Sequence, residues 1–368
     1  MTKSVLAINP GSTSTKFGLF EDSDIIFSVT LDHEAKLLDE YPAIADQLPF
    51  RVEAIRKELE TRSVNLNAID AFVGRGGLSY PVEGGTYAIN DILVHDVSVG
   101  VSGQHASNLG AMIARGFADE YEAQAFIVNP VVVDELEDVA RLTGLKEISR
   151  HSIVHALNQK EVAIQCARKL GKTYEESNFV VAHLGGGISI SAHRKGRIID
   201  TMNGLNGEGA MAATRSGALP AVGLLDLCFC GKYTRDEVYA LITKNGGLID
   251  HLGTGGLRKV KKMIDEGDDY ARLVYQTLIY QVGKTIGAYA AVLSGKVDRI
   301  ILTGGLANDA ELVKGVTGMI EFIAEVEVYP GELELEALAA GALRVLSGQE
   351  EARSYTGIPV WDGFDSVD

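Results

Sequence analysis

Cysteine is scarce in this sequence, with three residues among 368, and tryptophan occurs only once. Three cysteines cannot build the disulfide framework that holds small secreted domains together. Cys228 and Cys230 lie one residue apart, but no second pair of cysteines or histidines follows them at ligand spacing. Reduced, packed thiols are therefore favoured over a metal site, and a cytoplasmic location is expected.

Long apolar runs are also missing. No stretch of 18 residues is both apolar and uncharged, so a membrane-spanning helix is not expected. The run Val5–Ile8 near the start of the sequence is too short for the apolar part of a signal peptide. Neither membrane anchoring nor export is expected.

An excess of positive charge is absent as well, since 34 basic residues face 50 acidic ones and the net charge is −16. A polyanionic partner would be repelled, which argues against general nucleic-acid binding. An anionic ligand would have to be held by a local cluster of positive groups and metal. With 46% hydrophobic residues the chain can bury one large core or two medium cores, and two are expected.

Two strand–turn–strand hairpins are predicted half a chain apart, over 5–20 and over 179–192. An offset of 174 residues superposes Asn9 on His183 and aligns the two turns. Similar hairpins at this separation favour two duplicated domains. Further strands are predicted at 25–31, 71–74, 125–128, 299–302 and 326–329, and helices at 41–60, 107–121, 269–293, 310–324 and 335–346. This alternation predicts an α/β fold with a mixed sheet in each domain.

Glycine-rich or hydroxyl-rich turns follow three of these strands. The turn after Gly11 offers Ser12, Ser14 and Lys16. It lacks P-loop spacing and leads into a strand, so an ordinary polar turn is an equal alternative when it is taken alone. The other two turns contain Gly185-Gly186-Gly187 and Gly304-Gly305, where missing Cβ atoms let backbone approach a ligand closely. Together the three turns favour ATP held between two similar domains.

Several runs then resemble motifs of the acetate kinase family, in the same order along the chain. They are Ile8–Lys16, Val73–Gly77, Gly103–Gly110, Asn129–Glu135, Ile153–Lys160, Ala182–Gly187 and Ala213–Gly217. The resemblance covers Val5 to about Leu346. It implies two actin-like (ribonuclease H-like) domains with an interdomain nucleotide cleft, the first formed by 1–133 plus 335–368 and the second, nucleotide-binding, by 134–334.

The resemblance also implies an activity, which is reversible phosphoryl transfer from ATP to a small carboxylic acid, giving ADP and an acyl phosphate. Butyrate is the expected acid, with isobutyrate, propionate or acetate as alternatives. The expected metal is Mg²⁺, and the expected assembly is a homo-oligomer, at least a dimer. An ionised carboxylate needs no general base, only relief of repulsion between two anions. An actin-like ATPase switch or chaperone is the remote alternative. It is disfavoured because such a switch does not need an arginine clamp for a carboxylate.

Site residues follow from the same motifs. The residues implied in catalysis are Arg75 for the acid's carboxylate, Arg215 for the transferring phosphoryl group, and His183, His151 and His105. The residues implied in nucleotide or phosphate binding are Asn9, Ser12, Ser14, Lys16, Gly185, Gly186, Gly187, Gly304 and Gly305. The metal would be organised by Asn9 and Glu334, with Glu332 and Glu336 as alternative registers.

Three positions leave alternatives open. Asn129 stands where the family pattern has aspartate, so a role in the metal shell would come without a charge. His151 and His155 are four residues apart on a helix predicted from about Ser152, a spacing that could also suit zinc. Gly77 stands where acetate kinases carry a valine in the methyl pocket, so it either enlarges the acyl pocket or only permits a turn.

Overall fold

Two sheets divide the computed structural model, which describes residues 2–364, into two units. Unit 1 contains residues 2–134 and 333–364, and unit 2 contains Glu135–Glu332. The chain therefore leaves unit 1 once and returns to it with its last helix. Within residues 2–364 no helix combines the length and the apolar character that crossing a membrane requires.

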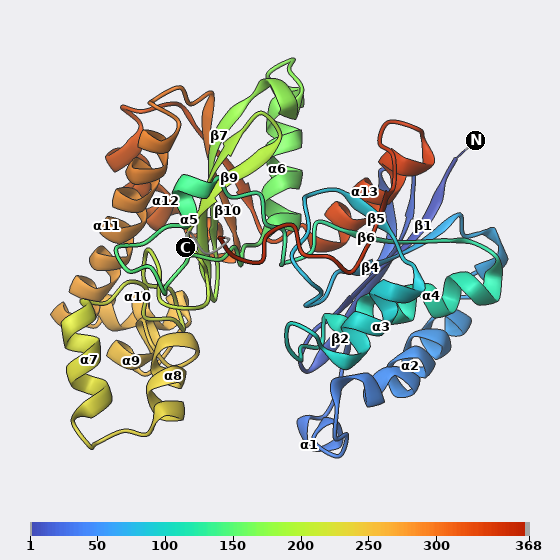
Figure 1. Ribbon diagram of the computed structural model, residues 1–368, viewed down its shortest axis with the longest axis horizontal. Helices are drawn as coiled ribbons and strands as arrows, with labels where there is room; N and C mark the ends of the chain where they lie inside the picture. Colours follow the sequence, from blue (N-terminus) through green and yellow to red (C-terminus); the bar gives the residue numbers. More distant parts are fainter. Residues whose placement is uncertain (1, 365–368) are drawn as a thin grey trace. The chain divides into compact units, whose positions relative to one another are not determined.

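Unit 1 is built on a seven-stranded mixed sheet in the order β12-β5-β6-β4-β1-β2-β3 (Figure 1). Its strands are β1 Ser4–Pro10, β2 Ser14–Glu21, β3 Asp24–Asp32, β4 Ala71–Arg75, β5 Thr86–Ala88, β6 Gln124–Val128 and β12 Arg353–Ser354. Its helices are α1 Ala35–Leu38, α2 Leu48–Thr61, α3 Asp91–Val99, α4 Asn108–Tyr121 and α13 Glu334–Leu346, with 3₁₀ turns η1 Ile44–Gln47 and η2 Leu66–Ala68.

The core of unit 1 explains which faces of the sheet the helices cover. On one face α4 packs on β4, and the rings of Phe72 and Phe117 stack 5.5 Å apart. On the other face, which Figure 1 shows covered by α13, Gly341 lets that helix approach Val128 of β6. Side chains alternate between the faces of a strand, so the apolar run of each central strand serves both layers.

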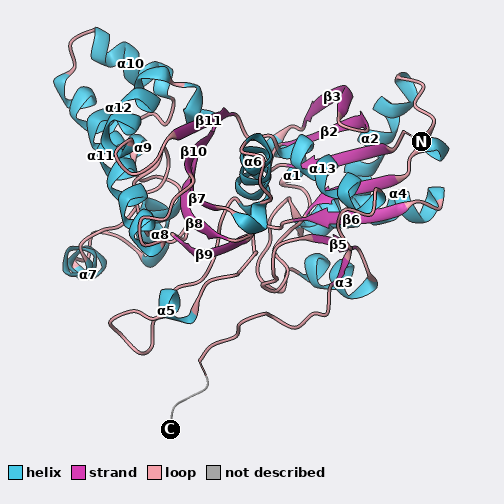
Figure 2. Ribbon diagram, turned by 90° about the horizontal axis from the view of Figure 1, so that it is seen from above, coloured by secondary structure: helices cyan, strands magenta, loops and turns pink. Residues whose placement is uncertain are grey.

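Unit 2 is built on a five-stranded mixed sheet in the order β11-β10-β7-β8-β9 (Figure 2). Its strands are β7 Asn178–Leu184, β8 Ile188–Arg194, β9 Arg197–Thr201, β10 Arg299–Gly304 and β11 Val326–Pro330. Its helices are α5 Asp138–Arg141, α6 Ala156–Lys169, α7 Ala221–Phe229, α8 Arg235–Thr243, α9 Leu248–Leu252, α10 Leu257–Asp265, α11 Asp269–Val292 and α12 Ala310–Ile320, with η3 Tyr174–Glu176 and η4 Gly305–Asn308.

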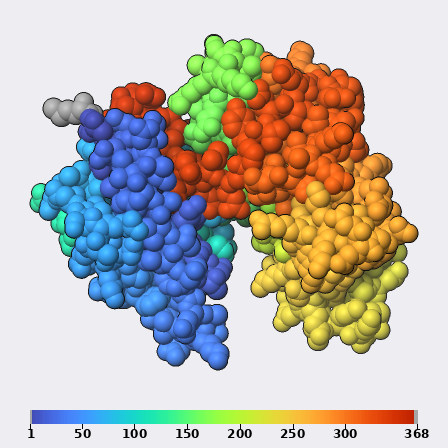
Figure 3. Space-filling view, turned by 180° about the vertical axis from the view of Figure 1, so that it is seen from behind, coloured from blue at the N-terminus to red at the C-terminus, as the bar shows by residue number. Residues whose placement is uncertain are grey.

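The long helix α11 packs on β7 and β8 of this sheet through apolar residues such as Leu278, Val282 and Ile286. α6 contacts β7 and β10. The short helices α7 to α10 come from one stretch of chain, coloured yellow to gold, which forms a lobe of unit 2 in Figure 3.

The predicted hairpins are confirmed as antiparallel pairs, β1 with β2 and β7 with β8. The offset of 174 residues carries the bounds of β1 onto those of β7. One helix start was wrong: α6 begins at Ala156, not near Ser152. His151 and His155 therefore precede the helix and do not share one of its faces, which removes the helical spacing behind the zinc alternative.

Candidate active site

Polar residues lie at the ends of three neighbouring parallel strands of unit 1. β1, β4 and β6 run parallel, and their last residues or the residues just beyond include Asn9, Arg75 and Asn129. Ligands of open α/β sheets bind outside the carboxyl ends of the strands. This edge is therefore the candidate site in unit 1.

Arg75, Asn9 and Glu334 form one group, which we call the Arg75 cluster. Arg75 Nη1 lies 2.6 Å from Glu334 Oε1 and donates to Asn9 Oδ1 at 3.2 Å. Asn9 Nδ2 donates to the other carboxylate oxygen of Glu334. The three residues come from β1, β4 and α13, so a guanidinium, an amide and a carboxylate from distant parts of the sequence meet at one point.

Close packing places Arg75. A Cβ on Gly74 would collide with the carbonyl of Gly110 in α4, and a Cβ on Gly110 would collide with the backbone of Arg75. The strand end and the helix can meet this closely only because both residues are glycine. The backbone of Arg75 is therefore held firmly, while its side chain extends beyond the sheet.

Glu334 owes its position to the start of α13. It is the first residue of that helix, and the preceding Leu333 has φ +46°, a left-handed conformation that is strained for a leucine. Of the three glutamates considered in this segment, Glu334 is the one that pairs with Arg75. A carboxylate in the first turn is also favoured by the helix dipole.

The β1–β2 hairpin carries the other predicted phosphate ligands of unit 1. Lys16 stands directly opposite Asn9 in the register, so the two side chains project from the same face. Ser12 and Lys16 are exposed, and Ser14 is half-buried. The turn closes with Gly11 N–H donating to the Ser14 carbonyl at 2.8 Å.

His105 precedes α4, and its Nδ1 lies 2.8 Å from Ser107 Oγ. Desolvation and the positive charge of Arg75 lower the pKa of His105 below its usual value. The imidazole is therefore neutral at pH 7 and can act as a neutral hydrogen-bonding group beside Arg75.

Asn129 has a structural use in the fold. Its Oδ1 accepts from Gly85 N–H at 2.8 Å, and its own N–H donates to the Gly85 carbonyl at 3.0 Å. Its φ of +38° lies in the left-handed region, which asparagine tolerates better than most residues. The amide oxygen considered for a metal shell is thus used to hold the loop before β5.

Gly77 does not open an acyl pocket. A Cβ placed on it would lie 2.5 Å from the Cα and 2.9 Å from the N of Asn108, the first residue of α4. The missing side chain would therefore point into the start of a helix, which contradicts the first of the two alternatives, an enlarged acyl pocket, and favours the second, a turn. The glycine permits close packing of this loop on α4.

In unit 2 the glycine turn between β7 and β8 meets the segment around Arg215. Thr214 donates to the Gly186 carbonyl from its N–H at 3.2 Å and from its hydroxyl at 3.0 Å. The Arg215 guanidinium lies so close to Gly187 that a Cβ there would collide with it. Arg215 therefore packs against this glycine turn.

Arg215 is poised for an anion. The Nη1 of Arg215 donates to the Gly204 carbonyl, while its buried Nε has no acceptor within residues 2–364. Burial lowers the pKa of Arg215, although a guanidinium remains protonated at neutral pH. A half-buried cation with an unused donor is an arrangement that a bound phosphoryl group would complete.

His183 lies on β7 just before the glycine turn and is buried. Its Nδ1 lies 2.8 Å from Asn158 Oδ1, and its ring stacks on His155 at 3.9 Å between centroids. Its Nε2 would be 3.3 Å from a Cβ on Gly185, so this nitrogen faces the glycine turn. Asn158, whose amide donates to the Glu332 carbonyl at 2.6 Å, fixes the ring orientation.

Gly304 and Gly305 end β10 beside the same turn. Gly304 has φ +88°, and a Cβ on it would lie 2.7 Å from Leu184 N. The structure thus brings together His183, the three glycines of the first turn, Arg215 and the Gly304-Gly305 turn in unit 2. His151 is exposed, and its carbonyl accepts from the Asn203 amide at 3.0 Å.

Within residues 2–364 no group of three or more histidine, cysteine, aspartate or glutamate side chains could hold a metal ion. All three cysteines are free, but only Cys166 is buried; Cys228 and Cys230 are exposed, so the expectation that they are packed is wrong. Asn9 and Glu334 still suit Mg²⁺, which usually takes one or two protein oxygens together with substrate phosphates and water.

Comparisons with known proteins identify the family. The family model described as "Acetokinase family" matches residues 146–340. Butyrate kinase 2 of Clostridium acetobutylicum is 50% identical over 351 residues, which cover 95% of this chain and 99% of that protein. The probable butyrate kinase of Clostridium botulinum (strain Alaska E43 / Type E3) is 47% identical over 355 residues, covering 96% of this chain and all of that protein. This chain belongs to the acetokinase family.

The fold is shared with a solved member of this family. The crystal structure of Porphyromonas gingivalis acetate kinase matches with a TM-score of 0.78 at 21% identity, covering 94% of this chain and all of that chain. The predicted fold class, α/β with two mixed sheets, is thereby confirmed. Family membership confirms the motif resemblance, whose residues the structure gathers at two edges, one in each unit.

Motif reasoning missed several residues that shape these two edges, each within its own unit. Asn158 and Thr214 lay inside the motif runs, but nothing in the sequence shows that one orients His183 and the other pairs with the glycine turn. Arg51 was missed completely, although it is fully buried behind the β1–β2 turn. An arginine in an amphipathic helix ordinarily predicts an exposed residue.

Proposed function

We propose that this acetokinase-family chain transfers the γ-phosphoryl group of ATP reversibly to butyrate, giving butyryl phosphate and ADP. The observation that carries the proposal is the 50% identity with butyrate kinase 2, which extends over 99% of that protein. In this reaction a carboxylate oxygen attacks the γ-phosphorus, a new O–P bond forms, and the bond from phosphorus to the bridging oxygen of ADP breaks.

The groups of the two edges suit this chemistry. Arg75 binds the acid's carboxylate, because a guanidinium fork matches its two oxygens. His105, neutral beside it, lines the acyl site, whereas His151 lies in unit 2. In unit 2, Arg215 donates to the transferring phosphoryl group, whose charge is spread over its oxygens in the transition state. Because His183 Nδ1 donates to Asn158 Oδ1, the Nε2 of His183 donates to the same group only in the imidazolium form.

Each unit has turns whose groups suit a nucleotide or its phosphates. Asn9, Ser12, Ser14 and Lys16 contact the terminal phosphates from unit 1. The turns Gly185–Gly187 and Gly304–Gly305 let the backbone of unit 2 approach the nucleotide. We assign the acyl site to unit 1 and the nucleotide site to unit 2, with domain bounds as the motifs predict.

Mg²⁺ is the expected metal, and Glu334 with Asn9 would hold it; when bound, it neutralises charge on the phosphates. Glu334 pairs with Arg75 in the described structure, so the same guanidinium keeps this carboxylate oriented. Asn129, engaged with Gly85, is left out of the metal shell in this proposal.

A coupled assay of ADP formation with acetate, propionate, butyrate, isobutyrate and valerate tests the proposal. Butyrate is expected to exceed acetate in kcat/KM by at least about tenfold, because each buried CH₂ that fits contributes about 0.8 kcal/mol. A preference for acetate would overturn the butyrate assignment. ATP hydrolysis that no acid stimulates would favour the ATPase-switch alternative.

A further inference from the structure

Behind the β1–β2 turn lies an arginine to which no function is assigned. Arg51, on α2, is fully buried, and its guanidinium contacts the turn from inside the unit. Its Nη1 donates to the carbonyls of Gly11 at 2.9 Å and Ser14 at 2.8 Å, and its Nη2 donates to the carbonyl of Ser12 at 3.2 Å.

These bonds give the turn two unlike sides. The remaining carbonyl, that of Thr13, accepts from His33 N–H at 2.8 Å, so every carbonyl from Gly11 to Ser14 is taken up on the inner side. The N–H groups of Ser12 and Thr13 donate to no acceptor within residues 2–364. A turn whose carbonyls are bound inward presents its N–H groups outward, which is the geometry of an anion-binding concavity.

The charge of Arg51 has no counter-ion in the protein. Within residues 2–364 none of its nitrogens lies within 4.0 Å of a carboxylate, and its side-chain partners are neutral. Gln47 Oε1 accepts from Nε at 3.1 Å and from Nη2 at 2.9 Å, and Thr15 Oγ1 accepts from Nη1 at 3.0 Å. Thr15 in turn lies 2.8 Å from His33 Nε2.

A buried cation without a counter-ion is costly, and folded proteins rarely keep one. Burial and the charge of Arg51 lower the pKa of the neighbouring His33, so this imidazole is neutral and adds no competing charge. A negative group bound on the outer side of the turn would be attracted by the uncompensated charge. Under the proposed function that group is a nucleotide phosphate.

We propose that Arg51 is a positioning residue of the phosphate-binding turn, which shapes the turn through its carbonyls and attracts bound phosphate with its buried charge. This inference rests on the proposed function only in that the turn binds ATP; it does not depend on which acid is phosphorylated.

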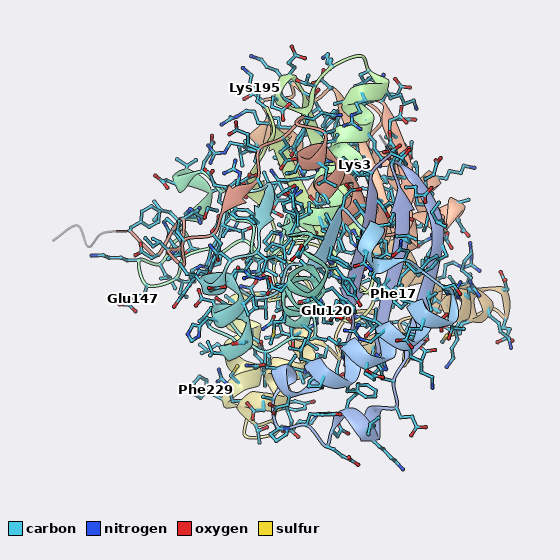
Figure 4. The ribbon with its side chains drawn as sticks, turned by 90° about the vertical axis from the view of Figure 1, so that its right-hand side faces the viewer. Lys3, Phe17, Glu120, Glu147, Lys195 and Phe229 are labelled. Carbon is cyan, nitrogen blue, oxygen red and sulfur yellow. The ribbon has the colours of Figure 1, made fainter. Side chains whose placement is uncertain are left out.

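Titration calorimetry with MgATP in the absence of acid is the test. Arg51→Gln is expected to raise the Kd for MgATP at least about tenfold, because both the shape of the turn and the charge are lost. Arg51→Lys keeps the charge and should recover part of the affinity. The matched control is Arg56→Gln on the same helix, where the wild-type arginine pairs at the surface with Glu120, labelled in Figure 4, and affinity should not change.

Gln47→Glu separates the charge of Arg51 from its structural role. A carboxylate at position 47 keeps both acceptor bonds to Arg51 but neutralises its charge, so the melting temperature should not fall. The Kd for MgATP should nevertheless rise about threefold to tenfold, since one charge acts over several ångströms at intermediate dielectric.

Wild-type affinity in Gln47→Glu would overturn the proposal, even if Arg51→Gln failed to fold. A wild-type protein that binds MgATP but phosphorylates no carboxylate would overturn the proposed function. The comparison of Kd values for MgATP would still decide the role of Arg51, because it does not involve the acid.

Discussion

Arg215 is half-buried, and its buried Nε donates to no acceptor in the described part of the chain. An unused donor of this kind can form a strong hydrogen bond when negative charge develops on a phosphoryl group beside it, as in the transition state. Arg215→Ala should therefore lower kcat by about 10³ or more, with a smaller effect on KM. Steady-state kinetics with saturating ATP and butyrate measure this, and Arg235→Ala, at an exposed ion pair, is the control. A kcat within a few-fold of wild type would remove Arg215 from the site.

Arg75 differs because it is already paired with Glu334. Arg75→Ala should raise the KM for the acid, since the fork for the carboxylate is lost. It should also change the Mg²⁺ concentration that gives half-maximal rate, because Glu334 loses its neighbouring positive charge. The variant is assayed by titrating butyrate and Mg²⁺ separately. An unchanged KM for the acid together with an unchanged Mg²⁺ dependence would contradict both roles.

Gly77 can be tested as a packing residue. Gly77→Ala would force a Cβ to 2.5 Å from Asn108 Cα, and backbone at a helix start cannot easily move. We expect a loss of about 1–3 kcal/mol in the free energy of unfolding and similar losses of activity with acetate and butyrate. Gly116→Ala, inside the same helix with no atom within 4 Å of the new Cβ, should instead be neutral or stabilising by up to about 1 kcal/mol. Denaturant unfolding compares the two, and selective loss of butyrate turnover in Gly77→Ala would restore the pocket interpretation.

At the scale of elements, strands and their turns were predictable where the signal is local. Apolar runs bounded by glycine and polar turns predicted the two hairpins, which are present as antiparallel pairs. The contacts of Gly77 and Arg51 were not predictable, because both depend on segments about 30 to 40 residues away. The start of α6 was misplaced because nothing in the sequence shows that Ser152 to His155 are held by tertiary contacts such as that of His155 with Ser189.

The start of α13 offers a prediction at this scale. Leu333 holds a left-handed conformation directly before Glu334, and such strain persists where the surrounding structure requires it. Leu333→Gly removes the strain but gains freedom in the unfolded chain, so the free energy of unfolding should change by less than about 1 kcal/mol. Looser placement of Glu334 should raise the Mg²⁺ concentration for half-maximal rate. Leu333→Asn tolerates the conformation without added freedom and should stay closer to wild type; equal Mg²⁺ dependence in all three proteins would contradict the argument.

At the scale of the whole molecule, a net charge of −16 is combined with local positive groups at the candidate edge of each unit. Arg75 and Lys16 in unit 1 and Arg215 in unit 2 lie at strand ends or turns, and Arg51 lies behind a turn. Composition could exclude a nucleic-acid partner but could not locate these groups. Only the fold brings β1, β4 and α13 together, and only then does the Arg75 cluster exist.

The division into two units leads to the last prediction, which concerns where each ligand binds. Butyrate alone should slow amide hydrogen exchange in unit 1, around Arg75 and His105, because the acid is bound there. MgADP alone should slow exchange in unit 2, at the turns that contain Gly186 and Gly305 and around Thr214. MgATP should add protection at Ser12 and Thr13, whose N–H groups have no acceptor in the described protein.

Ligand at about 100 times its Kd stabilises the bound state by about 2.7 kcal/mol, which is ample for detection. The control is the exposed helix α8, where exchange should not change. Protection by butyrate confined to unit 2, or by MgADP confined to unit 1, would reverse the assignment of the two sites.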